Sequence, residues 1–175
     1  WQDEKSYEEW VPDKENIYLV ENHISSFGNL SQSSYPQLYV SKEKFPEIED
    51  YTIANIWAWY KTRLIAGDNS SYSTVGQVSS QFFKFFPFET VAGNPNTALL
   101  DKSQMALSEE TAKQLFGDDY KTSIGKTVKK DQNGNVYTVS LIYKLPKKNS
   151  VFKTDYLILK KKKKNDDQWM SYSFF

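Results

Sequence analysis

The sequence of 175 residues contains no cysteine and a single histidine. Without cysteine there can be no disulfide bond, no thiolate metal site and no cysteine nucleophile, although the compartment stays open because many periplasmic proteins also lack cysteine. A Ser-His-Asp relay or a histidine zinc site would have to use His23, yet no HExxH or GxSxG pattern surrounds it. We therefore interpret His23 as an incidental, half-exposed residue, and a hydrolase that pairs it with a carboxylate is a minor alternative.

Excess charge of one sign and long hydrophobic runs are also missing. Lys+Arg and Asp+Glu are balanced at 22 each, so the chain has no overall basic field for nucleic acid. No segment approaches the roughly 18 consecutive apolar residues of a membrane helix, and the chain as given is expected to be soluble. It begins at Trp1 with neither an initiator methionine nor a signal peptide, which indicates a processed protein or a piece of a longer one.

The motifs that hold nucleotides or metals are absent as well. Neither GxxxxGK[ST] nor GxGxxG occurs, so neither common nucleotide-binding loop is present. The acidic pairs Glu47 with Glu49 and Asp118 with Asp119 lack the spacing of a calcium loop and are interpreted as solvated turns. We expect no cofactor, no metal and no catalytic residue, and the run of five lysines at 160–164 is interpreted as a solvated loop rather than a lipid-binding patch.

Aromatic residues, in contrast, are abundant. They make up 16% of the chain, and this content favours a β-rich fold because aromatic side chains fit a half-buried sheet surface. Strand alternation places Trp57 and Trp59 on one face, where a buried core face is the favoured interpretation. An exposed group of Trp57, Trp59 and Tyr60 would instead form an interaction surface, for example for a glycan.

Local patterns predict strands interrupted by a few helices, without regular βαβ alternation, which defines an α+β fold. The expected elements, in chain order, are a strand over 16–25, a short helix that stops before Pro46, a long hairpin over 52–80 that turns at 67–69, a helical turn within 79–86 ended by Pro87, a strand over 88–93, a helix within 105–119, a hairpin over 126–146 that turns at Asn133 and Gly134, and two strands in the tail.

The helix within 105–119 carries the strongest signals. Ser108 is a natural N-cap, Glu109 and Glu110 favour the positive end of the helix dipole, and Gly117 is placed for a C-terminal stop. The apolar side chains of this helix lie on one face and predict packing against a sheet.

Six segments, read in order, resemble the extracytoplasmic core domain of MacB-like and FtsX-like ABC transporter permeases, in its compact Bacteroidetes-type version. They are VSSQFFKFFPFETVAGN, the helix segment LSEETAKQLFGDD, SIGKTV, VYTVSLIY, KLPKKNS and FKTDYL. The matching positions that we expect to shape the structure are Phe82, Phe83, Gly93, Ser108, Ala112, Phe116, Gly117, Gly125, Pro146 and Ser150. The chain departs from the pattern at Leu141, where family members usually have glycine, and it ends where they usually continue for another strand-helix-strand portion.

The resemblance implies a single two-lobed periplasmic domain over 1–175. A membrane-proximal βαβ lobe would comprise 13–65 and 151–175, and an inserted, mostly β lobe with one well-formed helix would comprise 66–150. The resemblance also implies a non-catalytic role, in which ATP-driven movement is coupled to export of a peptide, antibiotic, toxin or lipoprotein. The implied partners are a cytoplasmic ATP-binding subunit, a periplasmic adaptor and a second permease, with membrane attachment through flanking helices.

The runner-up hypothesis is a secreted or surface-anchored protein that binds a glycan or another ligand through its aromatic face. Under this hypothesis Trp57, Trp59 and Tyr60 form the binding surface. Under the permease hypothesis the phenylalanines at 82, 83, 86 and 116 are instead expected to be buried together in one lobe.

Overall fold

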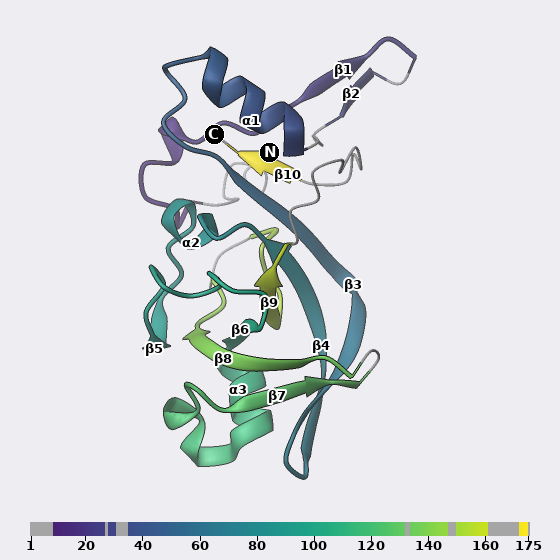
Figure 1. Cartoon of the computed structure of the whole chain (residues 1–175), viewed down its shortest axis with the longest axis vertical. Helices are drawn as coiled ribbons and strands as arrows, with labels where there is room; N and C mark the ends of the chain where they lie inside the picture. The colour runs from purple at the N-terminus through teal and green to yellow at the C-terminus, as the bar shows by residue number, and fades with distance from the viewer. Residues whose placement is uncertain are drawn as a thin grey trace.

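The fold comes from a computed structural model that describes residues 9–26, 28–30, 35–131, 134–146, 150–160 and 172–174. Strands dominate and helices are few (Figure 1). The elements in chain order are η2 (Lys14–Asn16), β1 (Asn22–Ile24), β2 (Gly28–Leu30), α1 (Tyr35–Lys44), β3 (Thr52–Ala66), β4 (Asn69–Val78), α2 (Phe82–Phe85), β5 (Thr90–Gly93), β6 (Gln104–Ser108), α3 (Glu109–Phe116), η3 (Gly117–Thr122), β7 (Thr127–Lys130), β8 (Val136–Tyr143), β9 (Tyr156–Leu159) and β10 (Tyr172–Phe174). Within these ranges, no helix combines the length and the hydropathy required to cross a bilayer.

One sheet of eight strands organises the molecule, in the order β10-β3-β4-β9-β6-β8-β5. The remaining strand, β7, pairs with both β3 and β8 and thereby closes β3, β4, β9, β6, β8 and β7 into a ring. Two pairs of neighbouring strands in this ring are parallel, β4 with β9 and β6 with β8. Each pair joins strands that are distant in the sequence. A separate hairpin, β1 with β2, projects beyond the end of the molecule that carries α1 (Figure 1).

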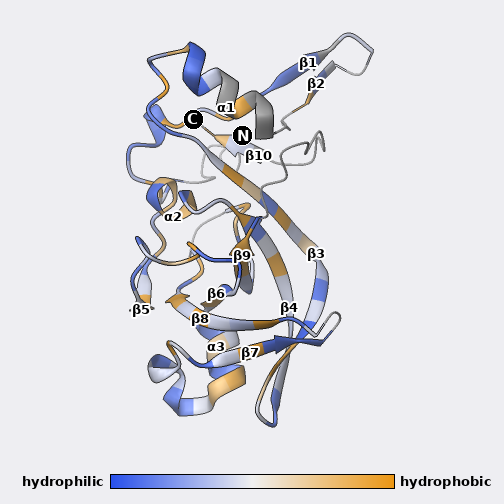
Figure 2. Ribbon diagram, viewed as in Figure 1, coloured by the Kyte–Doolittle hydropathy of each residue, from blue (hydrophilic) through white to orange (hydrophobic). Residues whose placement is uncertain are grey.

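The long hairpin of β3 and β4 runs through the whole molecule (Figure 1). The first three residues of β3, Thr52–Ala54, pair with β10, and Leu64 and Ile65 near its other end pair with β7. Hydrophobic and less hydrophobic residues follow one another in the first part of β3 and the last part of β4 (Figure 2), because successive side chains of a strand point to opposite faces. This alternation is interrupted by a register shift between Trp57 and Lys61.

Two large cores lie on opposite faces of the sheet. The first, which we call the ring core, receives side chains from all six strands of the ring and therefore fills its interior. It also includes Ala112 and Leu115 of α3, as the apolar face of that helix predicts. Along β6, Met105 and Leu107 point into the ring core whereas Ala106 points to the other face.

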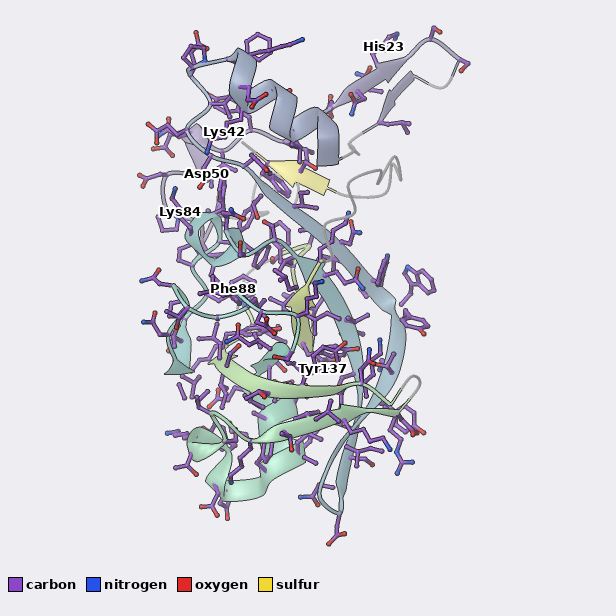
Figure 3. All side chains as sticks on the ribbon, viewed as in Figure 1. His23, Lys42, Asp50, Lys84, Phe88 and Tyr137 are labelled. Carbon is purple, nitrogen blue, oxygen red and sulfur yellow. The ribbon has the colours of Figure 1, made fainter. Side chains whose placement is uncertain are left out.

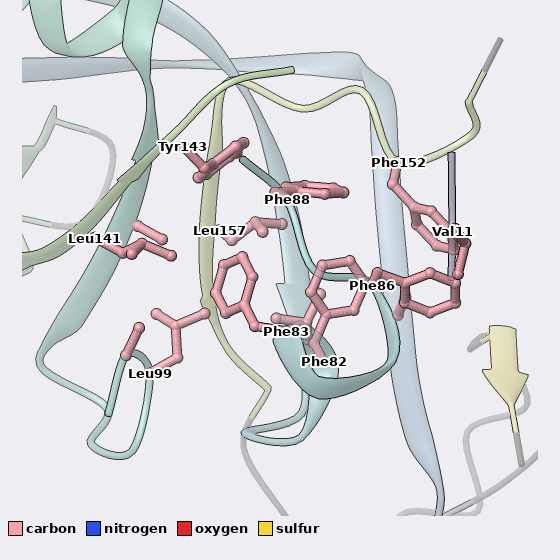
Figure 4. Packing of buried hydrophobic residues seen from close by; sticks show 14 residues of the cluster. Val11, Phe82, Phe83, Phe86, Phe88, Leu99, Leu141, Tyr143, Phe152 and Leu157 are labelled. Carbon is pink, nitrogen blue, oxygen red and sulfur yellow. The ribbon is translucent and has the colours of Figure 1, made fainter. Parts of the chain in front are cut away.

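The second core, the phenylalanine core, is built around residues 82–88, a segment with five phenylalanines in seven positions (Figure 4). Phe82 is fully buried and packs against four other phenylalanines, Phe83, Phe86, Phe88 and Phe152, with ring centroids 5.2–5.8 Å apart. Most of these pairs are edge-to-face, the geometry that aromatic quadrupoles favour. A third, small core under α1 contains Leu38, Tyr51 and Ile53.

Most of the predicted elements are present. The helix that stops before Pro46, the hairpin of β3 and β4, the helical turn before Pro87 and the strands on either side of the turn at Asn133 and Gly134 all form, although Asn133 itself lies outside the described residues. Of the lysine run, only Lys160 is described. The mixed fold class is confirmed, whereas the division into the two proposed lobes stays a prediction.

One strand was missed here and one burial prediction was wrong. The segment Gln104–Ser108 forms strand β6, which the sequence did not predict, whereas the helix begins at Glu109, as the predicted N-cap Ser108 requires. The reason is tertiary: β6 lies between β8 and β9, and its side chains alternate between the two large cores. Phe116 is only half-buried and packs against the ring core, so it does not join Phe82, Phe83 and Phe86.

Candidate functional site

His23 lies on β1 and is exposed. Its Nδ1 is 2.8 Å from Oδ1 of Asn29 on the neighbouring strand β2, so its hydrogen-bond partner is an amide and not a carboxylate. The described part of the chain contains no group of three or more His, Cys, Asp or Glu side chains that could hold a metal ion. The geometry around His23 therefore does not form a catalytic relay.

The acidic pairs that were interpreted as solvated turns are exposed. Glu47 and Glu49 lie in the connection between α1 and β3, and Asp118 and Asp119 lie in η3. The neighbouring carboxylate, Asp50, is far more constrained, and the sequence analysis overlooked it.

The positions carried by the family resemblance are spread over both large cores and their connections. Phe82 and Phe83 belong to the phenylalanine core, Ala112 to the ring core, and Ser108 caps α3 by accepting a hydrogen bond from the backbone N–H of Thr111 at 3.2 Å. Gly93 has a φ of +91°, and a Cβ added there would lie 2.4 Å from the backbone oxygen of Ser140. The remaining positions, Phe116, Gly117, Gly125, Pro146 and Ser150, lie at element ends or in connections.

The aromatic residues of β3 do not share one environment. Trp57 and Tyr60 are half-buried and pack against the ring core, whereas Trp59 is 81% exposed. The prediction of one buried face for Trp57 and Trp59 was wrong because the register shift after Trp57 breaks the strand alternation. Only Trp59 is thus available for broad contact with a partner, and the role of the three residues as an interaction surface stays a prediction.

Asp50 ties together two helices at the end of the molecule that carries α1 (Figure 3). Its carboxylate accepts hydrogen bonds from Lys42 of α1 at 3.3 Å, from Lys84 of α2 at 3.0 Å and from the backbone N–H of Tyr51 at 3.0 Å. Partial burial raises the pKa of Asp50, but the hydrogen bonds from Lys84, Tyr51 and Lys42 outweigh it and hold the pKa below its ordinary value.

A groove of about 760 Å³ opens beside Asp50, and we call it the acidic groove. Its described charged lining residues carry four carboxylates and one ammonium group, and several other lining residues are apolar. The lining residues are Pro12, Asp13, Asn16, Ile17, Tyr18, Glu47, Ile48, Glu49, Asp50, Lys84, Phe85 and Pro87.

A second groove, also of about 760 Å³, lies beyond Ile17, and we call it the apolar groove. Its walls come from five parts of the chain: the N-terminal segment, β3, the residue after α2, the connection before β9, and β10. The lining residues are Val11, Lys14, Ile17, Leu19, Ile56, Ala58, Trp59, Phe86, Ser150, Val151, Phe152, Lys153 and Phe174. Because these residues lie far apart in the sequence, no local pattern could have predicted the groove.

Both grooves are large enough to hold a ligand. The volume of each falls within the roughly 300–1,000 Å³ of small-molecule sites. The candidate functional site is therefore a pair of binding surfaces that share Ile17.

Comparison with known proteins gives one family and several related folds. The family model described as MacB-like periplasmic core domain matches residues 3–173. Among solved structures, a domain of a putative permease protein from Porphyromonas gingivalis is 20% identical, with a TM-score of 0.76 over 94% of this chain and 76% of that one. No curated protein matches the sequence significantly.

Two further solved structures share the fold at lower identity. The extracellular domain of the noncanonic ABC-type transporter YknZ from Gram-positive bacteria is 12% identical, with a TM-score of 0.59 over 91% of this chain and 81% of that one. The periplasmic region of MacB from Actinobacillus actinomycetemcomitans is 14% identical, with a TM-score of 0.57 over 90% of this chain and 72% of that one.

Proposed function

Because the chain belongs to the family of MacB-like periplasmic core domains, and is thus an extracytoplasmic domain of an ABC transporter permease, we propose that it transmits ATP-driven movement to an exported substrate. The match over 3–173, nearly the whole chain, is the observation that carries this proposal. The cargo would be a peptide, an antibiotic, a toxin or a lipoprotein, and the domain itself would perform no covalent chemistry.

The long hairpin of β3 and β4 supports a mechanical role. At one end β3 is paired with β10 under α1, and at the other end it is closed into the ring by β7. Its side chains enter all three cores, since Ile53, Ala54 and Leu64 each lie in a different one. A push applied to the α1 end would therefore reach the ring through packed side chains rather than through a loose connection.

The partners of such a domain would lie on both sides of a membrane. We propose a cytoplasmic ATP-binding subunit as the source of energy, a second permease as the symmetry mate, and a periplasmic adaptor as a contact of this domain. Attachment to the membrane would use transmembrane helices flanking the chain in its parent permease.

Because the 175-residue sequence contains no cysteine, an introduced cysteine can test whether this domain lies on the extracytoplasmic side of the membrane. A Lys102→Cys substitution, made in the parent permease expressed in its native host, places one thiol in an exposed turn of this domain. A maleimide that cannot cross membranes should label it in intact spheroplasts. Ala98→Cys is the matched control, because this position is 1% exposed and should stay unlabelled without denaturant.

The same cells test the coupling. A tag on the permease should co-purify an ATP-binding subunit, and deletion of this domain should abolish export while the subunit still binds. Labelling of Lys102→Cys only after lysis would refute the extracytoplasmic location, and purification without any ATP-binding protein would refute the transporter role.

A further inference from the structure

The described residues that line the apolar groove carry charge of one sign only. Lys14 and Lys153 are its two charged lining residues, both are exposed, and neither forms an ion pair within the described part of the chain. The acidic groove next to it has four carboxylates against a single lysine. The two surfaces that meet at Ile17 thus attract ligands of opposite charge.

The rest of the apolar groove is hydrocarbon with very few polar side chains. Among the described lining residues other than the two lysines, Ser150 alone has a polar group on an aliphatic side chain, and Trp59 adds an indole N–H. Apolar surface is also left open to solvent here, since Leu19 is 42%, Val151 52% and Trp59 81% exposed. Large apolar side chains that gather in one exposed groove mark a binding site.

The scarcity of polar side chains decides between two kinds of occupant. A peptide laid in the groove would bring backbone N–H and C=O groups, and each such group that is buried without a partner costs about 1–3 kcal/mol. An acyl chain brings no such groups, and it gains free energy with every methylene that leaves water. The groove therefore suits a hydrocarbon chain better than a polypeptide.

We propose that the apolar groove is a binding site for a single-chain anionic amphiphile, with the acyl chain against Ile56, Ala58 and Val151 and the carboxylate or phosphate headgroup between Lys14 and Lys153. The volume of about 760 Å³ lies within the range of small-molecule sites. The proposal concerns ligand binding by the folded chain and does not depend on the transporter role.

Displacement of a fluorescent fatty acid tests this site. The 175-residue chain is titrated with 11-(dansylamino)undecanoate, whose emission rises in an apolar environment, and the bound probe is then displaced below micellar concentrations. Dodecanoate and lysophosphatidylglycerol should displace it, which also separates a free fatty acid from a lipid headgroup as the preferred anion. Dodecyltrimethylammonium has the same chain with the opposite charge and should displace it at least about tenfold less well.

Substitutions place the ligand in this groove. Lys14→Gln and Lys153→Gln each remove one positive charge and should each weaken binding about fivefold, from about 1 kcal/mol per surface charge, whereas Lys102→Gln, at an exposed lysine elsewhere, should leave it unchanged. Ala58→Glu puts a carboxylate into the groove at an exposed position and should abolish binding. Val136→Glu is its matched control, since Val136 is 56% exposed and lies outside the groove.

Three results would overturn the proposal. One is equal displacement by the anionic and the cationic amphiphile, and another is unchanged binding in Ala58→Glu when circular dichroism shows it folded. The third is binding only to phosphatidylglycerol bilayers or only to acidic peptides, since either would assign the surface to a different class of partner.

Discussion

Asp50 shows what a single side chain contributes to the α1 end of the molecule. Replacement by asparagine removes the charge that attracts Lys42 and Lys84 but keeps the side-chain size. We expect Asp50→Asn to lower the free energy of unfolding at pH 7 by about 1 kcal/mol, the upper range for surface ion pairs. The measurement is urea denaturation of both proteins at the same ionic strength.

The stability difference between wild type and Asp50→Asn should depend on pH. The folded-state pKa of Asp50 lies below its ordinary value of 3.8, so its contribution to stability is complete above that value and is lost as the pH falls through the lowered folded-state pKa. The difference between wild type and Asp50→Asn should therefore be present at pH 7 and shrink below about pH 4. A difference that persists undiminished at pH 2 would contradict the prediction, and Asp68→Asn, an exposed turn residue, is the control.

Phe83 tests the phenylalanine core at the same scale. It is 4% exposed and packs against Phe82, Phe88 and Tyr143. Truncation to alanine should cost about 3–5 kcal/mol of unfolding free energy, as for other large-to-small core substitutions. The check is a chemical denaturation curve, and Phe45→Ala, which removes a 54% exposed ring, should cost far less. Equal midpoints for the two variants would disprove the expected burial effect.

For single aromatic residues, the sequence was a better guide to burial than to solvent exposure. The burial of Phe82, Phe83 and Phe86 was predicted and is confirmed. The exposure of Trp59 was not the favoured prediction, because strand alternation assumes a regular strand and gives no sign of a register shift. The contacts of Asp50 were also missed, since its partners lie 8 and 34 positions away in the sequence.

At the scale of elements, the junction between β6 and α3 depends on Ser108. Its hydroxyl accepts from the backbone N–H of Thr111 and donates to the Thr111 side chain at 2.9 Å, in a fully buried position. Ser108→Ala should therefore cost about 1 kcal/mol, because an N-terminal donor of α3 loses its partner. Hydrogen exchange should show faster exchange of the first amides of α3 in this variant.

The contrast between two substitutions isolates the cap. Ser108→Thr retains a capping hydroxyl, so it should preserve slow exchange in α3 better than Ser108→Ala does. Ser70→Ala, at an exposed position of β4, should leave exchange in α3 unchanged. If Ser108→Ala exchanged like wild type throughout α3, the hydrogen bond would not be what holds the helix start.

Elements with local signals were predictable and those defined by distant partners were not. The two hairpins were predicted from turn residues between strand-like runs, and Ser108 and Gly117 gave the ends of α3. Strand β6 was missed, because a five-residue strand whose side chains enter two cores has no polar face to show alternation. Its parallel pairing with β8 brings together segments about 35 positions apart, which no turn signal records.

At the scale of the whole molecule, the arrangement of the cores predicts cooperative unfolding. The phenylalanine core contains Val11 and Phe152 as well as Phe88 and Leu141, and the first two come from outside the inserted range 66–150. Separating the two ranges would break this core. We therefore expect a single transition in urea, with tryptophan fluorescence and far-ultraviolet circular dichroism giving the same midpoint.

The two signals sample different regions. Trp10 packs against Phe88 at 5.0 Å in the phenylalanine core, and Trp57 packs against the ring core. Fluorescence therefore reports on both cores, whereas circular dichroism reports on the backbone as a whole. Midpoints that differ between the probes would show that the two ranges unfold as separate lobes.

The family could be predicted from the sequence although the closed ring could not. Six short motifs in order pointed to the MacB-like fold, and the match over 3–173 confirms it. Ring closure depends on β7 reaching β3 through only two residue pairs, Leu64 with Lys130 and Ile65 with Lys129. The lining of both grooves likewise depends on tertiary neighbours, so the candidate binding surfaces became visible only in the folded molecule.

The place of β9 in the ring determines when the fold can be completed. This strand spans Tyr156–Leu159, late in the chain, yet it lies between β4 and β6, which precede it by roughly 80 and 50 positions. While the polypeptide emerges from its N-terminus, β4 and β6 each present an unpaired edge, and such edges are templates for aggregation. A nascent chain of this protein would need protection of both edges until Tyr156–Leu159 has been synthesised.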